Sequence, residues 1–224
     1  MIDENIQRTR ERIAAVCRRI KRNPAEITLV CVAKGRTTGQ IEEAVRSGLK
    51  DIGENRVQEA LLKYKEMRQA AGETLKWHMV GHLQSNKAKD AVRIFDLIHS
   101  VDSISLAQEI NKQAAKINKV QDVLLEVKTS PESTKFGFAT EEIPDSCGKM
   151  SKLSNIKIMG LMTIAPFGDN AQASRSYFAS LRKLREGFNP GWLLSMGMSD
   201  DFEVAIEEGA DIIRVGRAIF KNNV

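Results

Sequence analysis

The chain has 224 residues, enough for one domain with a sizeable core, and 42% of them are hydrophobic, which is ordinary for a globular protein. No apolar run is long enough to cross a membrane and no signal peptide opens the chain, so we expect a cytoplasmic protein. The net charge of +5 is spread among acidic residues and is not interleaved with aromatic side chains. Nucleic acid is therefore a weak alternative partner, and a membrane surface is not expected. The three cysteines form no CxxC motif, which argues against both a disulfide framework and a zinc site.

In chain order, apolar residues at helical spacing predict a first helix that Asp3 caps and that Asn23-Pro24 stops. Short β-branched or apolar runs then alternate with amphipathic stretches. We expect eight strands, at 27–34, 51–53, 75–80, 97–101, 120–127, 156–165, 192–196 and 212–216. The intervening helices are expected after the capping residues Thr37 or Thr38, Asn55, Ser85 or Asn86, Ser103, and Ser199 or Asp200, and at 146–153 and 171–186.

This alternation requires parallel strands joined by helical crossovers. Eight such units suit a closed (β/α)8 TIM barrel, and an open doubly wound sheet is the main rival. The absence of a Rossmann fingerprint weakens a dinucleotide-binding interpretation. We therefore predict one domain over residues 1–224, with the extra N-terminal helix covering the barrel where the last strand lacks a long helix of its own.

The first strand ends on Lys34. An ammonium group at the lip of an apolar core is costly unless it is paired, neutralised or used covalently. A neutral amine attacks an aldehyde to form a Schiff base. The alternative is that Lys34 leaves the strand and points into water, which is the commoner fate of a lysine at a strand end.

Glycines and serines follow the last two strands, where barrels of this class commonly bind phosphate. Ser195, Gly197 and Ser199 lie at the end of the seventh strand and just after it, and Gly216-Arg217 lie at the end of the eighth. Glycine lets backbone N–H groups approach phosphate oxygens, serine adds a donor, and arginine adds positive charge. Two ordinary glycine turns are the alternative. With Lys34 across the barrel mouth, the pattern suits a small phosphorylated aldehyde. Pyridoxal phosphate has both groups, an aldehyde for Lys34 and a phosphate for the glycines and serines.

Three further residues lie at or near this rim. Arg214, inside the eighth strand, could meet a pyridine nitrogen and keep it unprotonated, or could instead form an ion pair with Asp211. Asn55 either caps its helix or faces the ligand. His78, on the third strand, either points into the site or is a satisfied core histidine.

Several runs resemble the pyridoxal phosphate homeostasis protein family, which shares its barrel with the N-terminal domain of alanine racemase. The most specific are Gly53–Ala60, read as GENRVQEA, and the stretch from Trp77 to Lys87, which ends in LQSNK. The other matching runs are 32–34, 135–138, 160–163, 195–199 and 214–220. They follow the family's order over almost the whole chain. The chain departs from the family at Arg217, where a small hydroxyl residue is expected.

The resemblance implies that Lys34 carries pyridoxal phosphate as an internal aldimine, that Ser199 and Gly216-Arg217 meet the phosphate, and that Arg214 faces the ring nitrogen. It also implies a carrier that supplies cofactor, with PLP-dependent apoenzymes as recipients, and we expect a monomer without robust turnover. The rival is a PLP-dependent amino acid racemase. That reaction needs a second general base, which similar racemases take from a partner subunit carrying a further domain, and the chain leaves no room for such a domain.

Overall fold

The computed structural model describes residues 1–71, 75–130, 136–166 and 170–221, and eight parallel strands close into a barrel in it. Each strand pairs with the next in sequence, and β8 closes on β1 through the register Thr28↔Ile212 to Cys31↔Val215. This closure excludes the open doubly wound sheet. The strands are β1 (Thr28–Val32), β2 (Asp51–Glu54), β3 (Lys76–Met79), β4 (Leu97–Val101), β5 (Gln121–Glu126), β6 (Ile156–Met162), β7 (Leu193–Ser195) and β8 (Ile212–Val215).

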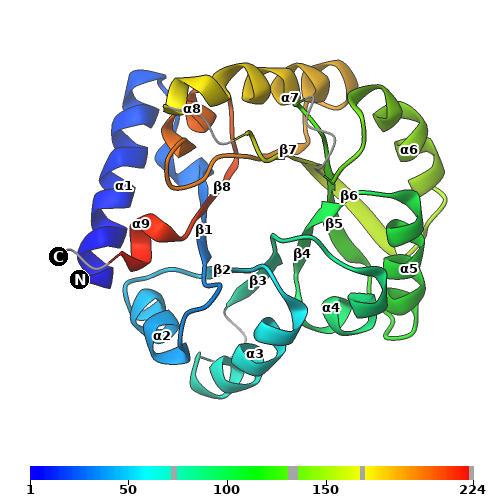
Figure 1. Ribbon diagram of the computed structural model, residues 1–224, viewed down its shortest axis with the longest axis horizontal. Helices are drawn as coiled ribbons and strands as arrows, with labels where there is room; N and C mark the ends of the chain where they lie inside the picture. The colour runs from blue at the N-terminus through cyan, green and yellow to red at the C-terminus, as the bar shows by residue number, and fades with distance from the viewer. Residues whose placement is uncertain (72–74, 131–135, 167–169, 222–224) are drawn as a thin grey trace.

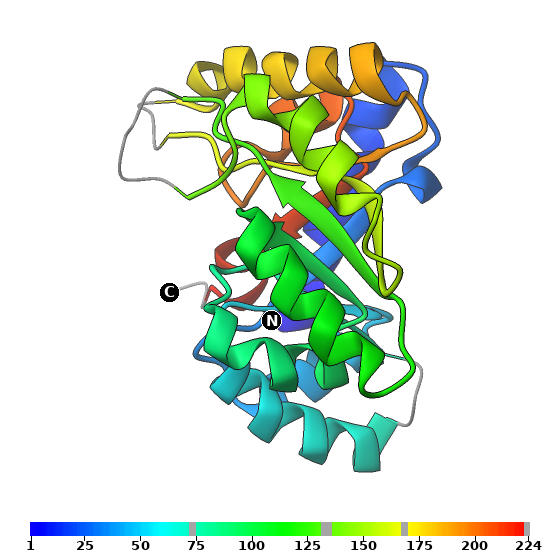
Figure 2. The ribbon, with the colours of Figure 1, turned by 90° about the vertical axis from the view of Figure 1, so that its right-hand side faces the viewer.

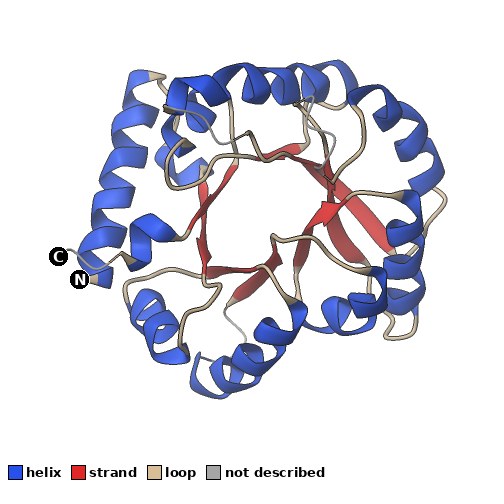
Figure 3. Cartoon of the chain, viewed as in Figure 1, coloured by secondary structure: helices blue, strands red, loops and turns tan. Residues whose placement is uncertain are grey.

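The helices form a ring outside the strands, with α3 and α7 on opposite sides of the barrel (Figures 1, 2 and 3). They are α1 (Ile2–Arg19), α2 (Thr38–Arg46), α3 (Val57–Ala71), α4 (Ala88–Ile94), α5 (Ile104–Ala115), α6 (Ile143–Met150), α7 (Arg175–Phe188), α8 (Phe202–Glu207) and α9 (Arg217–Phe220). Short 3-10 turns add η1 (Pro24–Glu26), η3 (Ser85–Lys87), η4 (Thr140–Glu142) and η5 (Ala171–Ser174). No helix in these ranges is both long and apolar enough to cross a membrane.

Local sequence sets several helix starts. The Thr37 hydroxyl accepts the backbone N–H of Gln40, and the Gln40 side chain accepts the backbone N–H of Thr37. These two hydrogen bonds form a capping box at the start of α2. The Ser103 hydroxyl likewise accepts the N–H of Leu106 at the start of α5. Three cap predictions are wrong. Ser85 and Asn86 lie within η3, whose cap position is Gln84, and Lys87 holds the cap position of α4. Met1, not Asp3, occupies the cap position of α1, and Asp3 lies in the first turn, where a carboxylate still favours the helix dipole.

The helix after β7 also begins later than predicted. Its cap position is Asp201 rather than Ser199 or Asp200. The reason is that the Asp201 carboxylate accepts the backbone N–H of Met198 and the Ser174 hydroxyl, at 2.6 and 2.9 Å, which holds 198–201 as a turn. Ser199 is therefore left in the loop, at the barrel mouth.

The N-terminal helix covers the place where α8 and α9 are short, as predicted, and it packs against both (Figure 1). Buried Asn5 on α1 donates to the carbonyls of Ile219 and Lys221, each at 3.0 Å. These bonds fasten the last described turn of the chain to its first helix.

Two apolar clusters stabilise the barrel. The larger lies between strands and helices, and the smaller fills the barrel interior with Val30, Val80, Leu97, Leu124, Met162 and Ile212. Gly160 lies where β6 bulges against β5. Its φ is +159°, and a Cβ there would meet the Leu193 carbonyl oxygen at 2.0 Å, so only glycine allows β6 and β7 to approach this closely.

Candidate binding site at the barrel mouth

A small pocket of about 160 Å³ opens at the carboxyl ends of the strands. This is the end at which TIM-barrel proteins place their functional groups. Four apolar side chains form its walls and three cationic side chains reach it. Its lining residues are Val32, Lys34, Asn55, Val80, Ile164, Met198, Ser199, Arg214, Gly216 and Arg217. Six of the nine predicted site residues are thus brought together: Lys34, Asn55, Ser199, Arg214, Gly216 and Arg217.

Lys34 lies in the turn after β1, one residue past buried Ala33. The first strand ends at Val32, earlier than the predicted Lys34, and Lys34 is exposed, as in the alternative in which it leaves the strand. The backbone around it is held on both sides. Lys63 Nζ donates to the Ala33 carbonyl at 2.7 Å, and the Gly35 N–H donates to Glu59 Oε2 at 3.2 Å.

Lys63 is itself buried against Glu54 at the end of β2, with Nζ 2.6 Å from Oε1. Glu54 is 0% exposed, and its Oε2 has no hydrogen-bond partner among the described residues. Burial raises the pKa of the Glu54 carboxyl, against the lowering effect of the Lys63 ammonium. Glu54, Glu59 and Lys63 all belong to or follow the GENRVQEA run, so this signature holds the turn that presents Lys34. Sequence reasoning did not find this role.

The loops after β7 and β8 meet at Ser199. Its hydroxyl accepts the backbone N–H of Ala218 at 3.2 Å, and Arg217 forms an ion pair with Asp200 on the loop that also carries Ser199. A Cβ on Gly216 would lie 3.0 Å from the Val32 carbonyl oxygen, so this position favours glycine where β8 ends beside β1. Ser199, Gly216 and Arg217 form one side of the pocket.

Gly197 and Ser195 are not among the residues that line the pocket. Gly197 has φ +91°, and a Cβ there would meet Ala205 Cβ at 2.5 Å, so it lets the loop pass close to α8. Ser195 is fully buried beneath Arg214. These two predicted residues therefore support the pocket from behind.

Arg214 is 4% exposed and reaches the pocket from β8. Nη1 donates to Ser195 Oγ at 2.6 Å, and Nη2 donates to the Thr163 carbonyl at 2.9 Å. Burial lowers the pKa of its guanidinium to about 10, which the Glu126 and Asp201 carboxylates oppose. The alternative pair with Asp211 is not formed, because that carboxylate contacts Arg22 at 2.6 Å and Arg185 at 3.3 Å.

His78 points into the barrel, below the pocket and not into it. It is 4% exposed, with Nδ1 2.9 Å from His99 Nε2 and Nε2 3.0 Å from Asp51 Oδ1. The structure thus gives it the place of a satisfied core histidine. Within the described ranges, no group of three or more histidine, cysteine or acidic side chains could hold a metal ion.

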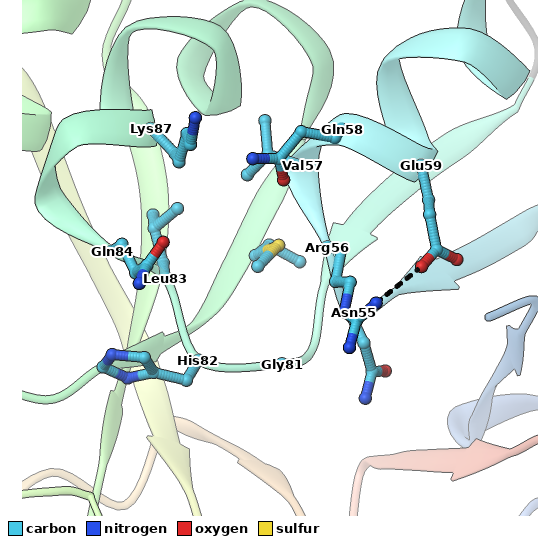
Figure 4. A pocket seen from close by; sticks show the side chains of 11 residues that line it. Asn55, Arg56, Val57, Gln58, Glu59, Gly81, His82, Leu83, Gln84 and Lys87 are labelled. Carbon is cyan, nitrogen blue, oxygen red and sulfur yellow. Dashed lines mark ion pairs between the residues drawn. The ribbon is translucent and has the colours of Figure 1, made fainter.

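A second, larger hollow of about 610 Å³ adjoins Asn55 on the outer side (Figure 4). The GENRVQEA run and the stretch from Gly81 to Lys87 form most of its walls. Gly81 allows the two loops to meet, since a Cβ there would lie 2.5 Å from the Asn55 carbonyl oxygen. Arg56 reaches Glu59 at 3.6 Å, as the dashed line in Figure 4 shows. Both signature runs are thus neighbours in space beside the first pocket.

Comparison with known proteins identifies the family. The family described as "Alanine racemase, N-terminal domain" matches residues 2–224. A pyridoxal phosphate homeostasis protein of Aquifex aeolicus is 43% identical over 222 residues, covering 97% of this chain and 96% of that one. A protein of the same name from Pseudomonas aeruginosa is 39% identical, covering 98% and 94%.

Among solved structures, PipY of Synechococcus elongatus with PLP bound superposes with a TM-score of 0.84 at 36% identity, covering 98% of this chain and 100% of that one. An alanine racemase of Clostridium difficile gives 0.75 at 15% identity, covers 98% of this chain and 60% of its own, and shows the shared fold. The chain belongs to the alanine racemase N-terminal-domain family and, within it, to the pyridoxal phosphate homeostasis proteins.

Proposed function

We propose that this protein binds pyridoxal phosphate at the barrel mouth, attaches it as a Schiff base to Lys34, and serves PLP homeostasis by delivering it to PLP-dependent apoenzymes. The observation that carries the proposal is that one pocket joins Lys34, Ser199 and Arg214. A PLP-bound relative of the same fold at 36% identity supports the choice of ligand.

The residues present fit the chemistry of this cofactor. Lys34, Arg214 and Arg217 supply positive charge around a ligand that carries a phosphate. Val32, Val80 and other apolar walls suit the faces of an aromatic ring. Gly216 and the Ser199 hydroxyl line the same pocket, and together they offer a backbone without a side chain and a hydroxyl group to a phosphate.

When bound, the cofactor would supply an aldehyde that condenses with an amine, forming a C=N bond and releasing water. Lys34 is the amine that the pocket offers, and the bonds from Lys63 and Glu59 to the adjoining backbone orient its turn. Arg214 would face the ring nitrogen as a fixed cation, since guanidinium has donors and no acceptor. It would leave that nitrogen unprotonated and weaken the ring as an electron sink.

A cofactor ring that is a weak electron sink favours cofactor binding over catalytic turnover. The rival function is a PLP-dependent amino acid racemase, which needs a second base on the opposite face of the substrate. Among the described residues that line the pocket, Lys34 is the side chain suited to accept a proton in such a step. We therefore propose a carrier, a monomer acting in the cytoplasm, with residues 1–224 as one domain.

Titration of the purified protein with pyridoxal phosphate, followed by visible absorption, tests the proposal. A saturable yellow band in the wild type and in Lys152→Ala, an exposed-lysine control, and no such band in Lys34→Ala, would support it. Equal bands in all three proteins would refute attachment at Lys34. Incubation with L-alanine then separates the two functions, because D-alanine formed catalytically would favour the racemase.

A further inference from the structure

A line of five polar side chains crosses the barrel interior from one mouth to the other. Its contacts are Arg214 Nη1 to Ser195 Oγ at 2.6 Å, Ser195 Oγ to His99 Nδ1 at 2.9 Å, His99 Nε2 to His78 Nδ1 at 2.9 Å, and His78 Nε2 to Asp51 Oδ1 at 3.0 Å. The residues come from β8, β7, β4, β3 and β2. Every link is within hydrogen-bond distance.

The ends of this line lie in different surroundings. Arg214 lines the pocket at the carboxyl ends of the strands, whereas Asp51 begins β2 and lines a separate hollow at the opposite mouth, beside Thr28 and Lys50. Ser195 and His99 are 0% exposed, and the side chain of Asp51 is 22% exposed. The line therefore has a buried arginine at one end, an acid near water at the other, and one serine and two histidines between.

Hydrogen-bonding chemistry assigns a direction to the line. Arg214 can only donate, so Ser195 Oγ accepts from it. Ser195 Oγ contacts no third polar group among the described residues, so its own proton must point to His99 Nδ1. His99 then carries its proton on Nε2 and donates to His78 Nδ1, and His78 in turn donates from Nε2 to Asp51.

The reverse direction fails at two links. If His99 donated from Nδ1, the buried Ser195 hydroxyl would lose its only acceptor, at the cost of an unmade hydrogen bond. His78 would also need protons on both ring nitrogens to satisfy His99 and Asp51 together. Burial, with help from His78 and Arg214, holds the pKa of His99 well below its ordinary value, which agrees with a neutral ring.

We propose that Ser195, His99 and His78 are positioning residues, forming a relay, a one-way chain of hydrogen bonds that runs from Arg214 to the acceptor Asp51 and orients Arg214 toward the ligand pocket. A flexible guanidinium at this site could turn toward other acceptors. The relay directs the Ser195 proton to His99 and so keeps the Oγ lone pairs available to accept from Nη1, which, with the Thr163 carbonyl on Nη2, holds the plane of the guanidinium. The link to the cofactor rests on the proposed function, but the relay itself does not.

The relay is tested first on protein without cofactor. The chain has three histidines, so ring ¹⁵N spectra of histidine-labelled protein are readily assigned with His78→Gln and His99→Gln. His82, outside the barrel and paired with Asp102 at 3.0 Å, is the internal reference. We expect both His78 and His99 to be neutral, with the proton on Nε2. A proton on Nδ1 of His99, or a doubly protonated His78, would overturn the relay.

The second arm measures the effect on the ligand. Ser195→Ala should weaken pyridoxal phosphate binding by about three- to tenfold, the range expected for one lost hydrogen bond, and should alter the visible spectrum of the bound ligand. Ser195→Thr keeps the hydroxyl and should restore both. Unchanged binding and spectrum in Ser195→Ala would refute a role in positioning. If wild-type protein binds no cofactor but shows the expected tautomers, the proposed function fails and the relay stands.

Discussion

Replacing Lys63 with methionine tests how the protein presents Lys34. Methionine keeps most of the side-chain volume but removes the ammonium that bonds Glu54 Oε1 at 2.6 Å and the Ala33 carbonyl at 2.7 Å. A carboxylate that is 0% exposed then loses its counter-charge. Removing one partner of a buried ion pair costs about 3–5 kcal/mol. For a chain of this size that corresponds to a fall in Tm of roughly 6–20 °C.

The stability lost in Lys63→Met should depend on pH. Burial already raises the pKa of Glu54, and the loss of Lys63 removes the main opposing effect. A carboxyl whose pKa is raised on folding contributes stability below its unfolded pKa, and this contribution is lost as the pH rises through its folded pKa. The deficit of Lys63→Met relative to wild type should therefore be smallest in acid, where Glu54 can take up a proton, and largest at neutral pH.

Thermal unfolding followed by circular dichroism at several pH values measures this deficit. Lys65→Met, on the exposed face of the same helix, is the matched control and should change Tm little. Adding Glu54→Gln to Lys63→Met removes the orphaned charge and should recover part of the loss at neutral pH. A deficit that is absent, or that is the same at every pH, would show that the buried pair does not hold this turn.

Further predictions concern the pocket and its support. Ser199→Ala should weaken cofactor binding by about 1–3 kcal/mol, measured by equilibrium titration against Ser154→Ala, and an unchanged affinity would argue against a phosphate contact. Burial raises the pKa of Glu126 to about 7, so between its ordinary value and pH 7 the protein should lose on the order of 3 kcal/mol of stability as pH rises. Glu126→Gln should remove that slope in denaturant unfolding. Gly160→Ala should prevent normal folding because its Cβ would overlap the backbone of β7, and a soluble variant with unchanged Tm would contradict the close approach.

The barrel could be predicted because its signals are local. Eight apolar runs, separated by caps such as Thr37 and Ser103, leave few alternatives to alternating strands and helices. The prediction that Lys34 and Ser199 meet at one mouth followed from a rule about parallel strands, and the structure brings them into one pocket. Their assignment as ligand contacts remains a prediction that the structure does not test.

The missed features depend on contacts between distant residues. The sequence places His99 inside a predicted strand, but its partner Ser195 lies 96 positions away on another strand. The available signal was that His99 shares the alternating positions of Leu97 and Val101, which are apolar. The end of the first strand was predicted wrongly, at Lys34, because strand patterning does not tell where a strand stops, and β1 stops at Val32.

We propose that pyridoxal phosphate is attached to Lys34 and to no other lysine. The most direct measurement is borohydride reduction of the protein with one equivalent of pyridoxal phosphate, followed by peptide mass mapping. We expect a single labelled peptide that contains Lys34 and that disappears in Lys34→Ala. A label spread over surface lysines, or one that persists on another lysine in that variant, would contradict it.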